Sequence, residues 1–299
     1  MESRGKIIAI LGPTSAGKSA VAVRLAKKFD GEVVSVDSRQ IYRGMDVGTG
    51  KITLAEQAGI KHWMLDIASP RTNFSAAQFK KKADRAITDI LKRGKLPILC
   101  GGTGFWIKSI VDNITYPEVK PDLVLRNDLN NESAAELFGR LQKLDPQRAK
   151  NIDAKNKVRL IRAIEICKTL GRVPAEKSSP RYETLQIGLA APKDELHAKI
   201  KKRLGRRWRD GMVEEVKRLH QQGLSWKKIQ SFGLGYFWIP EYLREKISLE
   251  ELYEKVYLAE KDYAKRQMTW FKKDIRIIWL EKYRDVKKTA ADFLKSDAR

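Results

Sequence analysis

The sequence is poor in two features that define whole classes of protein: cysteine and long apolar runs. Its two cysteines, Cys100 and Cys167, belong to no C-x-x-C pair, so we expect neither a zinc site nor a disulfide framework. No apolar stretch reaches the roughly 18 residues that span a bilayer. The first apolar run begins at Ile7, which leaves no room for a signal peptide before it. We therefore expect a cytoplasmic monomer with no membrane attachment.

Basic residues far outnumber acidic ones and give a strong excess of positive charge. Lys and Arg number 60 against 37 Asp and Glu, a formal net charge of +23 at pH 7. An excess of this size predicts a polyanionic partner, and we favour nucleic acid over an anionic membrane surface. Hydrophobic residues make up 42% of the chain, which is enough for the core of one large domain or two smaller ones.

The clearest motif follows the first apolar run. Residues 7–11 predict a buried strand and residues 20–28 a helix. The segment between them has the pattern G-x-x-x-x-G-K-S of a phosphate-binding P-loop. In such a loop, backbone N–H groups and the lysine hold a di- or triphosphate, and the serine can offer its hydroxyl to Mg²⁺. The loop consists of Gly12, Pro13, Thr14, Ser15, Ala16, Gly17, Lys18 and Ser19.

Further predicted strands alternate with helices along the chain. They cover residues 33–37, 62–67, 96–101, 185–190 and 275–280. This alternation predicts an α/β fold with a parallel sheet covered on both faces, whose ligands bind at the carboxyl ends of the strands. Two stretches, about 118–182 and 212–270, predict consecutive helices without a strand. We therefore expect a P-loop, kinase-like core formed by residues 1–117 and 183–299, with a helical domain inserted at 118–182.

Two other loops follow predicted strands. Asp37 ends the second strand, where its carboxylate could hold Mg²⁺, act as a base, or cap the next turn. Spacing alone does not choose between these roles. The segment Gly101-Gly102-Thr103-Gly104 ends another strand, and its glycines would allow a ligand to approach closely beside the Thr103 hydroxyl. A plain tight turn would need the same glycines.

Basic residues gather in two predicted helices. Seven of them, and no acid, lie between residues 199 and 209, where a helix that only covered a core would carry a clearer apolar stripe. This density predicts contact with phosphate or RNA, and Arg203 could clamp a diphosphate bidentately. Arg159 and Arg162 stand three positions apart on one helix face, which suits a row of phosphates, although an ordinary charged face would look the same.

Several separate segments together resemble the tRNA dimethylallyltransferase family, also called the tRNA isopentenyltransferases. GPTSAGKS is similar to the family's P-loop, and VDSRQIYRGMDVGTGK, residues 36–51, to its second signature. LPILCGGTGFWIKSI at 96–110, RLIRAIEI at 159–166 and AKRQMTWF at 264–271 resemble three later ones. Because these segments occur in order over nearly the whole chain, the resemblance is far more specific than a lone P-loop.

The resemblance implies an activity and a set of site residues. The family transfers a dimethylallyl group from dimethylallyl diphosphate to N6 of the adenosine 3′ of the anticodon in tRNA and releases diphosphate. Asp37 would be the base toward N6 and Thr103 would position the amine. The P-loop, a nucleotide- and ATP-binding motif elsewhere, would hold the diphosphate together with Arg203, with Mg²⁺ on Ser19. The residues implied to contact the anticodon stem-loop of tRNA are Asp37, Ser38, Arg39, Gln40, Thr103, Arg159, Arg162, Gly235 and Tyr236.

Three other functions stay open on the sequence. An adenylate isopentenyltransferase would share the P-loop and Asp37, but should lack the long helical regions and much of the basic charge. A P-loop small-molecule kinase would consume ATP without tRNA. A non-catalytic RNA-binding protein with the P-loop as a switch would bind RNA without prenyl transfer.

Overall fold

The protein divides into two compact units in a computed structural model that describes residues 5–176 and 178–296. The first, here the core unit, comprises Met1–Asn113 and Pro180–Arg299; the second, here the helical unit, comprises Ile114–Ser179. The inserted domain expected at 118–182 and the helical unit overlap from 118 to 179.

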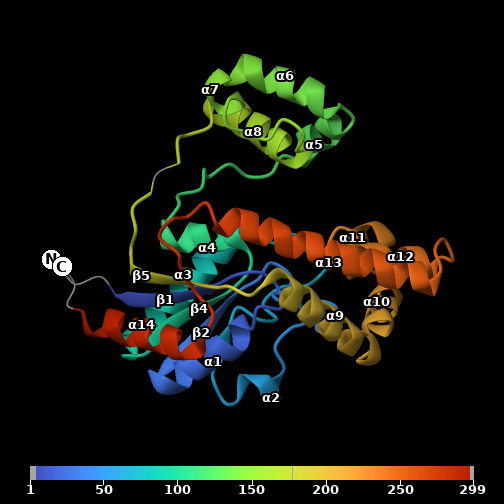
Figure 1. The fold of residues 1–299 in the computed structure, drawn as a ribbon. Coiled ribbons are helices and arrows are strands. Elements are labelled where there is room, and N and C mark those ends of the chain that lie inside the picture. The colour runs from blue at the N-terminus through green and yellow to red at the C-terminus, as the bar shows by residue number, and fades with distance from the viewer. Residues whose placement is uncertain (1–4, 177, 297–299) are drawn as a thin grey trace. The chain divides into compact units, whose positions relative to one another are not determined.

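The core unit is built on one sheet of six strands, all parallel, in the order β3-β2-β4-β1-β5-β6. Figure 1 labels four of them, β1, β2, β4 and β5. The central strand β1 pairs on both sides, with Ile8 opposite Ile98 of β4 and Leu185 of β5. This confirms the predicted α/β fold. The strands are β1 (Lys6–Leu11), β2 (Gly31–Val36), β3 (His62–Trp63), β4 (Leu96–Gly101), β5 (Glu183–Leu189) and β6 (Ile278–Leu280).

Two strands are shorter than predicted. The predicted strand at 62–67 ends after Trp63, because Met64 and Asp66 adopt the left-handed region with φ of 68° and 54°, where the chain leaves the sheet. The last strand begins at Ile278 instead of at residue 275. Neither departure moves the carboxyl ends of β1, β2 and β4.

Helices cover both faces of the sheet, as predicted. Because neighbouring strand residues point to opposite faces, Ile8 and Ile10 of β1 pack toward α1 (Lys18–Lys28) and α14 (Tyr283–Lys295). Ile7 and Ala9 pack toward the other layer, where Phe79 lies in the same cluster. That layer contains α3 (Ala76–Lys92), α4 (Gly104–Val111) and α13 (Leu249–Phe271).

The core unit contains further helices. They are α2 (Leu54–Gln57), α9 (Lys193–Arg209), α10 (Met212–Gln221), α11 (Trp226–Gln230) and α12 (Gly235–Leu243). Helix α9 differs from its prediction, since it does carry an apolar stripe: Leu196, Ile200 and Leu204 are buried at four-residue spacing. Most of its basic residues therefore flank this stripe, whereas Arg207 is buried.

The helical unit has a hydrophobic core of its own. Leu129, Leu137 and Leu160 are fully buried in it. Its helices are α5 (Leu123–Asn130), α6 (Ala134–Leu144), α7 (Pro146–Ala149) and α8 (Lys157–Leu170). Across both units, none of the helices that the structure describes combines the length and the apolar character needed to cross a membrane.

Candidate active site

A cavity of about 660 Å³ opens in the core unit where β1, β2 and β4 end. The P-loop lines it with residues on either side of the start of α1, and the loops after β2 and β4 line it opposite. Three residues of the predicted motif, Gly12, Pro13 and Ala16, are absent from the lining, so they shape the loop. The lining residues of the motif are Thr14, Ser15, Gly17, Lys18 and Ser19.

Lys18 lines the cavity. Its ammonium donates to the Pro13 carbonyl at 2.6 Å, so a backbone oxygen of the same loop binds the positive charge of Lys18. Burial lowers the pKa of Lys18 to about 8, and the neighbouring Arg203 cation acts in the same direction. A group that loses hydration in this way is stabilised strongly when an anion enters beside it.

Arg203 reaches the P-loop from α9. Its Nη1 donates to Thr14 Oγ1 at 2.8 Å and its Nη2 to the Gly50 carbonyl at 2.9 Å. Gly50 has a φ of +59°, and a Cβ there would collide with the Arg203 guanidinium. Glycine at this position thus allows the backbone to approach Arg203 closely. Burial lowers the pKa of Arg203, as it does for Lys18.

Asp37 and Thr103 come together from two neighbouring strand ends. Asp37 Oδ1 accepts from the backbone N–H groups of Arg39 at 2.8 Å and Gln40 at 3.4 Å. Thr103 Oγ1 accepts from the Ser38 N–H at 3.0 Å, which ties the two loops together. The turn-capping role considered for Asp37 is therefore real, but it uses one oxygen. Oδ2 makes no hydrogen bond with the residues that the structure describes, and Asp37 lines the cavity.

Gln267 of α13 is a site residue that the sequence interpretation missed. Its side chain is 6% exposed; Oε1 accepts from the Thr14 N–H at 2.7 Å and Nε2 donates to the Gly102 carbonyl at 3.0 Å. A Cβ on Gly102 would collide with that amide, and one on Gly104 with Trp270. These glycines therefore admit side chains of α13, where the sequence suggested a ligand. The segment AKRQ contained Gln267, but nothing in it indicated the partners.

Tyr236, which was predicted to contact tRNA, is buried in this structure and lines the cavity. It is 2% exposed, and its hydroxyl donates to Glu215 at 2.6 Å. Gly235 is also buried, against Met212. Glu215 in turn accepts from the backbone N–H groups of Asp46, Val47 and Gly48 at 2.7, 2.7 and 2.9 Å. Tyr236 therefore supports a wall of the cavity.

Arg159 and Arg162 belong to the helical unit and differ in their surroundings. Arg159 is exposed on α8. Arg162 donates to the Val119 carbonyl at 3.0 Å and pairs with buried Glu165. Arg162 thus stabilises its own unit, and the two residues do not form the equivalent pair that their spacing suggested.

Two cations share one aromatic ring at the edge of the cavity. The Arg39 guanidinium lies 5.7 Å and the Lys228 ammonium 5.4 Å from the ring centroid of Phe232. Neither takes part in an ion pair within the described residues. Burial, and then Arg39, lowers the pKa of Lys228. Like charges held together without a carboxylate favour binding of an anion.

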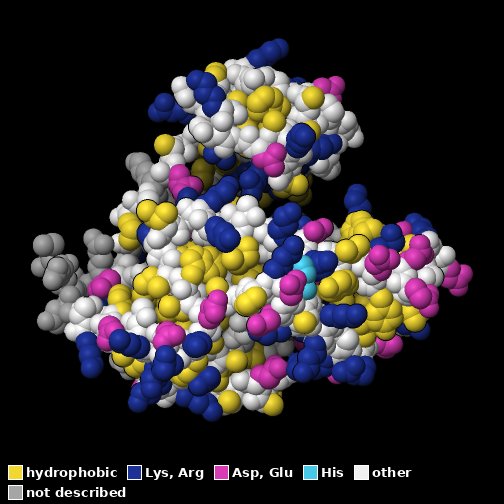
Figure 2. Space-filling model, in the orientation of Figure 1, with side chains coloured by type: hydrophobic (Ala, Val, Ile, Leu, Met, Phe, Trp, Pro, Cys, Tyr) yellow, Lys and Arg dark blue, Asp and Glu magenta, His cyan; other side chains and the backbone are white. Residues whose placement is uncertain are grey.

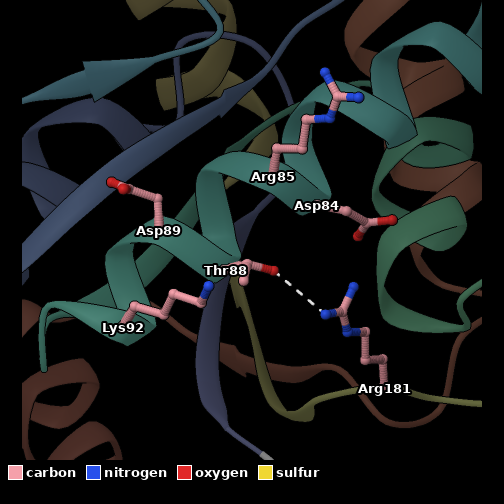
Figure 3. A pocket seen from close by; sticks show the side chains of 6 residues that line it. All are labelled: Asp84, Arg85, Thr88, Asp89, Lys92 and Arg181. Atoms are coloured by element: carbon pink, nitrogen blue, oxygen red, sulfur yellow. Dashed lines mark hydrogen bonds between the residues drawn. The ribbon is translucent and has the colours of Figure 1, made fainter.

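A second hollow, of about 390 Å³, lies against α3 (Figure 3). Asp84 and Asp89 line it, but they pair with Lys80 and Arg93. It contains no residue of the P-loop or of the loops after β2 and β4. Lys and Arg side chains are spread over both units in the view of Figure 2, with acidic ones among them. Only the P-loop cavity, of these two hollows, joins phosphate-binding groups to a carboxylate.

The parallel sheet and this cavity define an α/β enzyme of the P-loop class. A sequence model described as IPP transferase matches residues 40–274. The chain is 40% identical over 288 residues to a tRNA dimethylallyltransferase of Thermomicrobium roseum, covering 94% of this chain and 88% of the relative. A Geobacter sulfurreducens protein of the same name is 39% identical over 289 residues, with 93% of each covered.

Solved structures agree with these matches. The tRNA isopentenylpyrophosphate transferase of Bacillus halodurans superposes with a TM-score of 0.74 at 34% identity, covering 97% of this chain and 96% of that one. A eukaryotic dimethylallyltransferase acting on tRNA gives a TM-score of 0.80 at 25% identity, covering 97% and 77%. The chain belongs to the IPP transferase family, and it is a prenyltransferase.

Proposed function

We propose that the protein transfers a dimethylallyl group from dimethylallyl diphosphate to N6 of the adenosine 3′ of the anticodon in tRNA, and releases diphosphate. The observation that carries the proposal is the presence, in one cavity, of the P-loop lysine and of Asp37, whose loop is tied to the neighbouring loop by the Ser38–Thr103 hydrogen bond. The first group suits a diphosphate leaving group, and the second suits an amine that loses a proton. The names of the relatives, tRNA dimethylallyltransferases, support the same reaction.

Lys18 and Arg203 would stabilise the leaving group. As the bond between C1 of the allyl group and the diphosphate oxygen breaks, negative charge builds on that oxygen. Cations fixed in place before the reaction then bind the transition state more strongly than the substrate. Both residues are anchored by hydrogen bonds to the P-loop, which supports this role.

Asp37 would accept the proton from the acceptor amine. The new bond joins adenine N6 to C1 as the C1–O bond breaks, and the N6 proton passes to Asp37 Oδ2. Oδ1 keeps its two backbone hydrogen bonds, which would hold the carboxylate in one orientation. The Thr103 hydroxyl already accepts from Ser38, so its own hydrogen stays available to orient the acceptor.

Mg²⁺ fits the oxygen chemistry of the cavity. The described residues contain no cluster of three His, Cys, Asp or Glu side chains that could ligate a metal. Mg²⁺ is commonly held by one or two protein oxygens together with substrate phosphates. Ser19 lines the cavity and would supply a protein oxygen. When bound, the ion would neutralise part of the diphosphate charge.

The anticodon stem-loop would approach the edge of the cavity where Arg39 and Lys228 flank Phe232. The target base must leave its stack to reach Asp37. Ser38 and Gln40 line the cavity and would contact the nucleotide, and exposed Arg159 would contact RNA from the helical unit. The reaction would take place in the cytoplasm, where the tRNA is found.

The test offers competing acceptors to the same protein. Radiolabelled dimethylallyl diphosphate and Mg²⁺ are incubated with unmodified tRNA whose anticodon is followed by adenosines, with AMP in parallel, and ATP consumption is followed separately. We expect label in tRNA alone. Label in AMP would favour an adenylate isopentenyltransferase, and ATP turnover without label a small-molecule kinase.

A further inference from the structure

A buried ion pair forms part of one wall of the cavity. Arg207, in the last turn of α9, contacts Glu260 of α13 with Nη1 and Oε1 2.7 Å apart, and each side chain is 6% exposed. Removing two charges from water is costly unless the remaining donors and acceptors are also satisfied. The other hydrogen bonds of Arg207 therefore indicate which part of the structure the ion pair stabilises.

Arg207 directs those donors at a single loop. Its Nε donates to the Val47 carbonyl at 2.9 Å, and its Nη2 donates to the Gly48 carbonyl. Glu215 binds the N–H groups of the same loop, as described above. Residues 46–48 have no regular secondary structure, so these two side chains replace the backbone partners that a strand would provide.

The loop leads directly to the residue that aims Arg203. Two positions beyond Gly48, the Gly50 carbonyl accepts from Arg203 Nη2 at 2.9 Å and from Gln40 Nε2 at 3.3 Å. Arg203 and Arg207 are four positions apart, so they lie on the same side of α9. Arg207 fixes the loop, and the loop fixes the direction of Arg203.

We propose that Arg207, held by Glu260, is a positioning residue: it locks loop 46–50 so that the Gly50 carbonyl holds the Arg203 guanidinium toward the diphosphate site. The inference rests on the diphosphate site of the proposed function and adds a residue to it. Although Arg207 lines the cavity, its Nε, Nη1 and Nη2 donate to Val47, Glu260 and Gly48, so we assign its role to the loop and not to the leaving group. Its effect should appear in diphosphate affinity and not only in stability.

The test measures binding of inorganic diphosphate with Mg²⁺ by calorimetry, so it requires no prenyl transfer. We expect Arg207→Met to weaken binding by about tenfold, the effect of losing hydrogen bonds from a charged group. Arg207→Lys should restore part of the affinity, because an ammonium can keep the Glu260 contact but lacks the planar fork that reaches both carbonyls. Wild-type affinity in a folded Arg207→Met protein would overturn the proposal.

Two further variants separate positioning from charge and from stability. Glu260→Gln should weaken diphosphate binding by about threefold or more, because Arg207 loses its charged anchor. Tighter binding would mean that Arg207 acts only through its charge.

Arg93→Met is the matched control, since Arg93 pairs with buried Glu32 away from the cavity. It should lower the melting temperature and leave diphosphate affinity unchanged. Equal weakening in Arg93→Met and Arg207→Met would contradict a positioning role. Diphosphate binding that follows these patterns while tRNA receives no label would leave the inference standing and reject the proposed acceptor.

Discussion

The side-chain oxygen of Gln267 accepts a hydrogen bond from the backbone N–H of Thr14 at 2.7 Å, across 253 positions of the chain. The amide nitrogen of the same side chain donates to Gly102 in the loop that carries Thr103. One buried residue of α13 thus connects the loop that would hold the leaving group to the loop that would orient the acceptor. The distance between the two halves of the reaction depends on it.

Replacing Gln267 with Leu should impair catalysis more than it impairs folding. The change leaves the Thr14 N–H and the Gly102 carbonyl buried without partners, which should cost about 2 kcal/mol in the free energy of unfolding. We expect kcat to fall by at least about tenfold as the loops separate. Chemical denaturation and steady-state kinetics measure the two effects. Gln230→Leu, which removes a partly buried amide bonded to Glu241, is the control and should leave kcat unchanged.

Diphosphate affinity should fall as the pH rises past the pKa of Lys18, about 8 in the free protein. Below that pH the ammonium is charged and binds the anion; above it, binding must first restore a proton. The dissociation constant should therefore rise by about tenfold per pH unit above 8. In Lys18→Arg the side chain stays charged, so this slope should be lost. An identical slope in both proteins would assign the titration to another group.

Adding a methyl group at Gly50 should displace Arg203. A Cβ there would collide with the guanidinium, whereas one at Gly44, which also has positive φ, would meet nothing within 4 Å. Gly50→Ala and Gly44→Ala should both lose about 1 kcal/mol of stability to backbone strain. Only Gly50→Ala should lose diphosphate affinity. Melting temperature measures the loss of stability in each variant, and calorimetry measures its diphosphate affinity. Equal diphosphate affinity in the two variants would contradict the displacement of Arg203.

Lys228→Gln should weaken tRNA binding without changing the KM for dimethylallyl diphosphate. The paired cations at Phe232 would contact RNA phosphates, so removing one should lower the salt dependence of tRNA affinity by about one counterion. Lys288→Gln is a suitable control, because Lys288 is exposed on α14. This helix packs on the same face of the sheet as α1. Filter binding at several salt concentrations measures both slopes. Equal slopes in the two variants would place the RNA elsewhere.

The P-loop lysine and serine could be predicted because their chemistry is contained in short motifs at the ends of strands. Asp37 and Thr103 were predicted from the family resemblance, and their roles remain predictions. Gln267, Glu215 and Glu260 were missed, because each acts on a backbone group or a charge far away in the chain. A single amide or carboxylate on a helix carries no periodic pattern that reveals such a partner. The burial of Tyr236 and Arg207 was missed for the same reason, since packing between helices decides it.

The early end of β3 also escaped prediction for a local reason. Met64 and Asp66 adopt positive φ although neither is glycine, so the composition of 62–67 predicted a longer strand. The sheet order was equally beyond reach, because it depends on which strands pair and not on their individual sequences.

The most direct test of the proposed chemistry is a single turnover with the wild-type protein and Asp37→Asn, using labelled dimethylallyl diphosphate and unmodified tRNA. Binding of both substrates is measured in parallel, and the product is digested to locate the label. We predict that the wild type places the label on N6 of the adenosine 3′ of the anticodon. Asp37→Asn should bind both substrates but transfer the label about 10²- to 10⁴-fold more slowly, the contribution of a general base. Transfer at the wild-type rate by Asp37→Asn, or label on another nucleotide, would contradict the account.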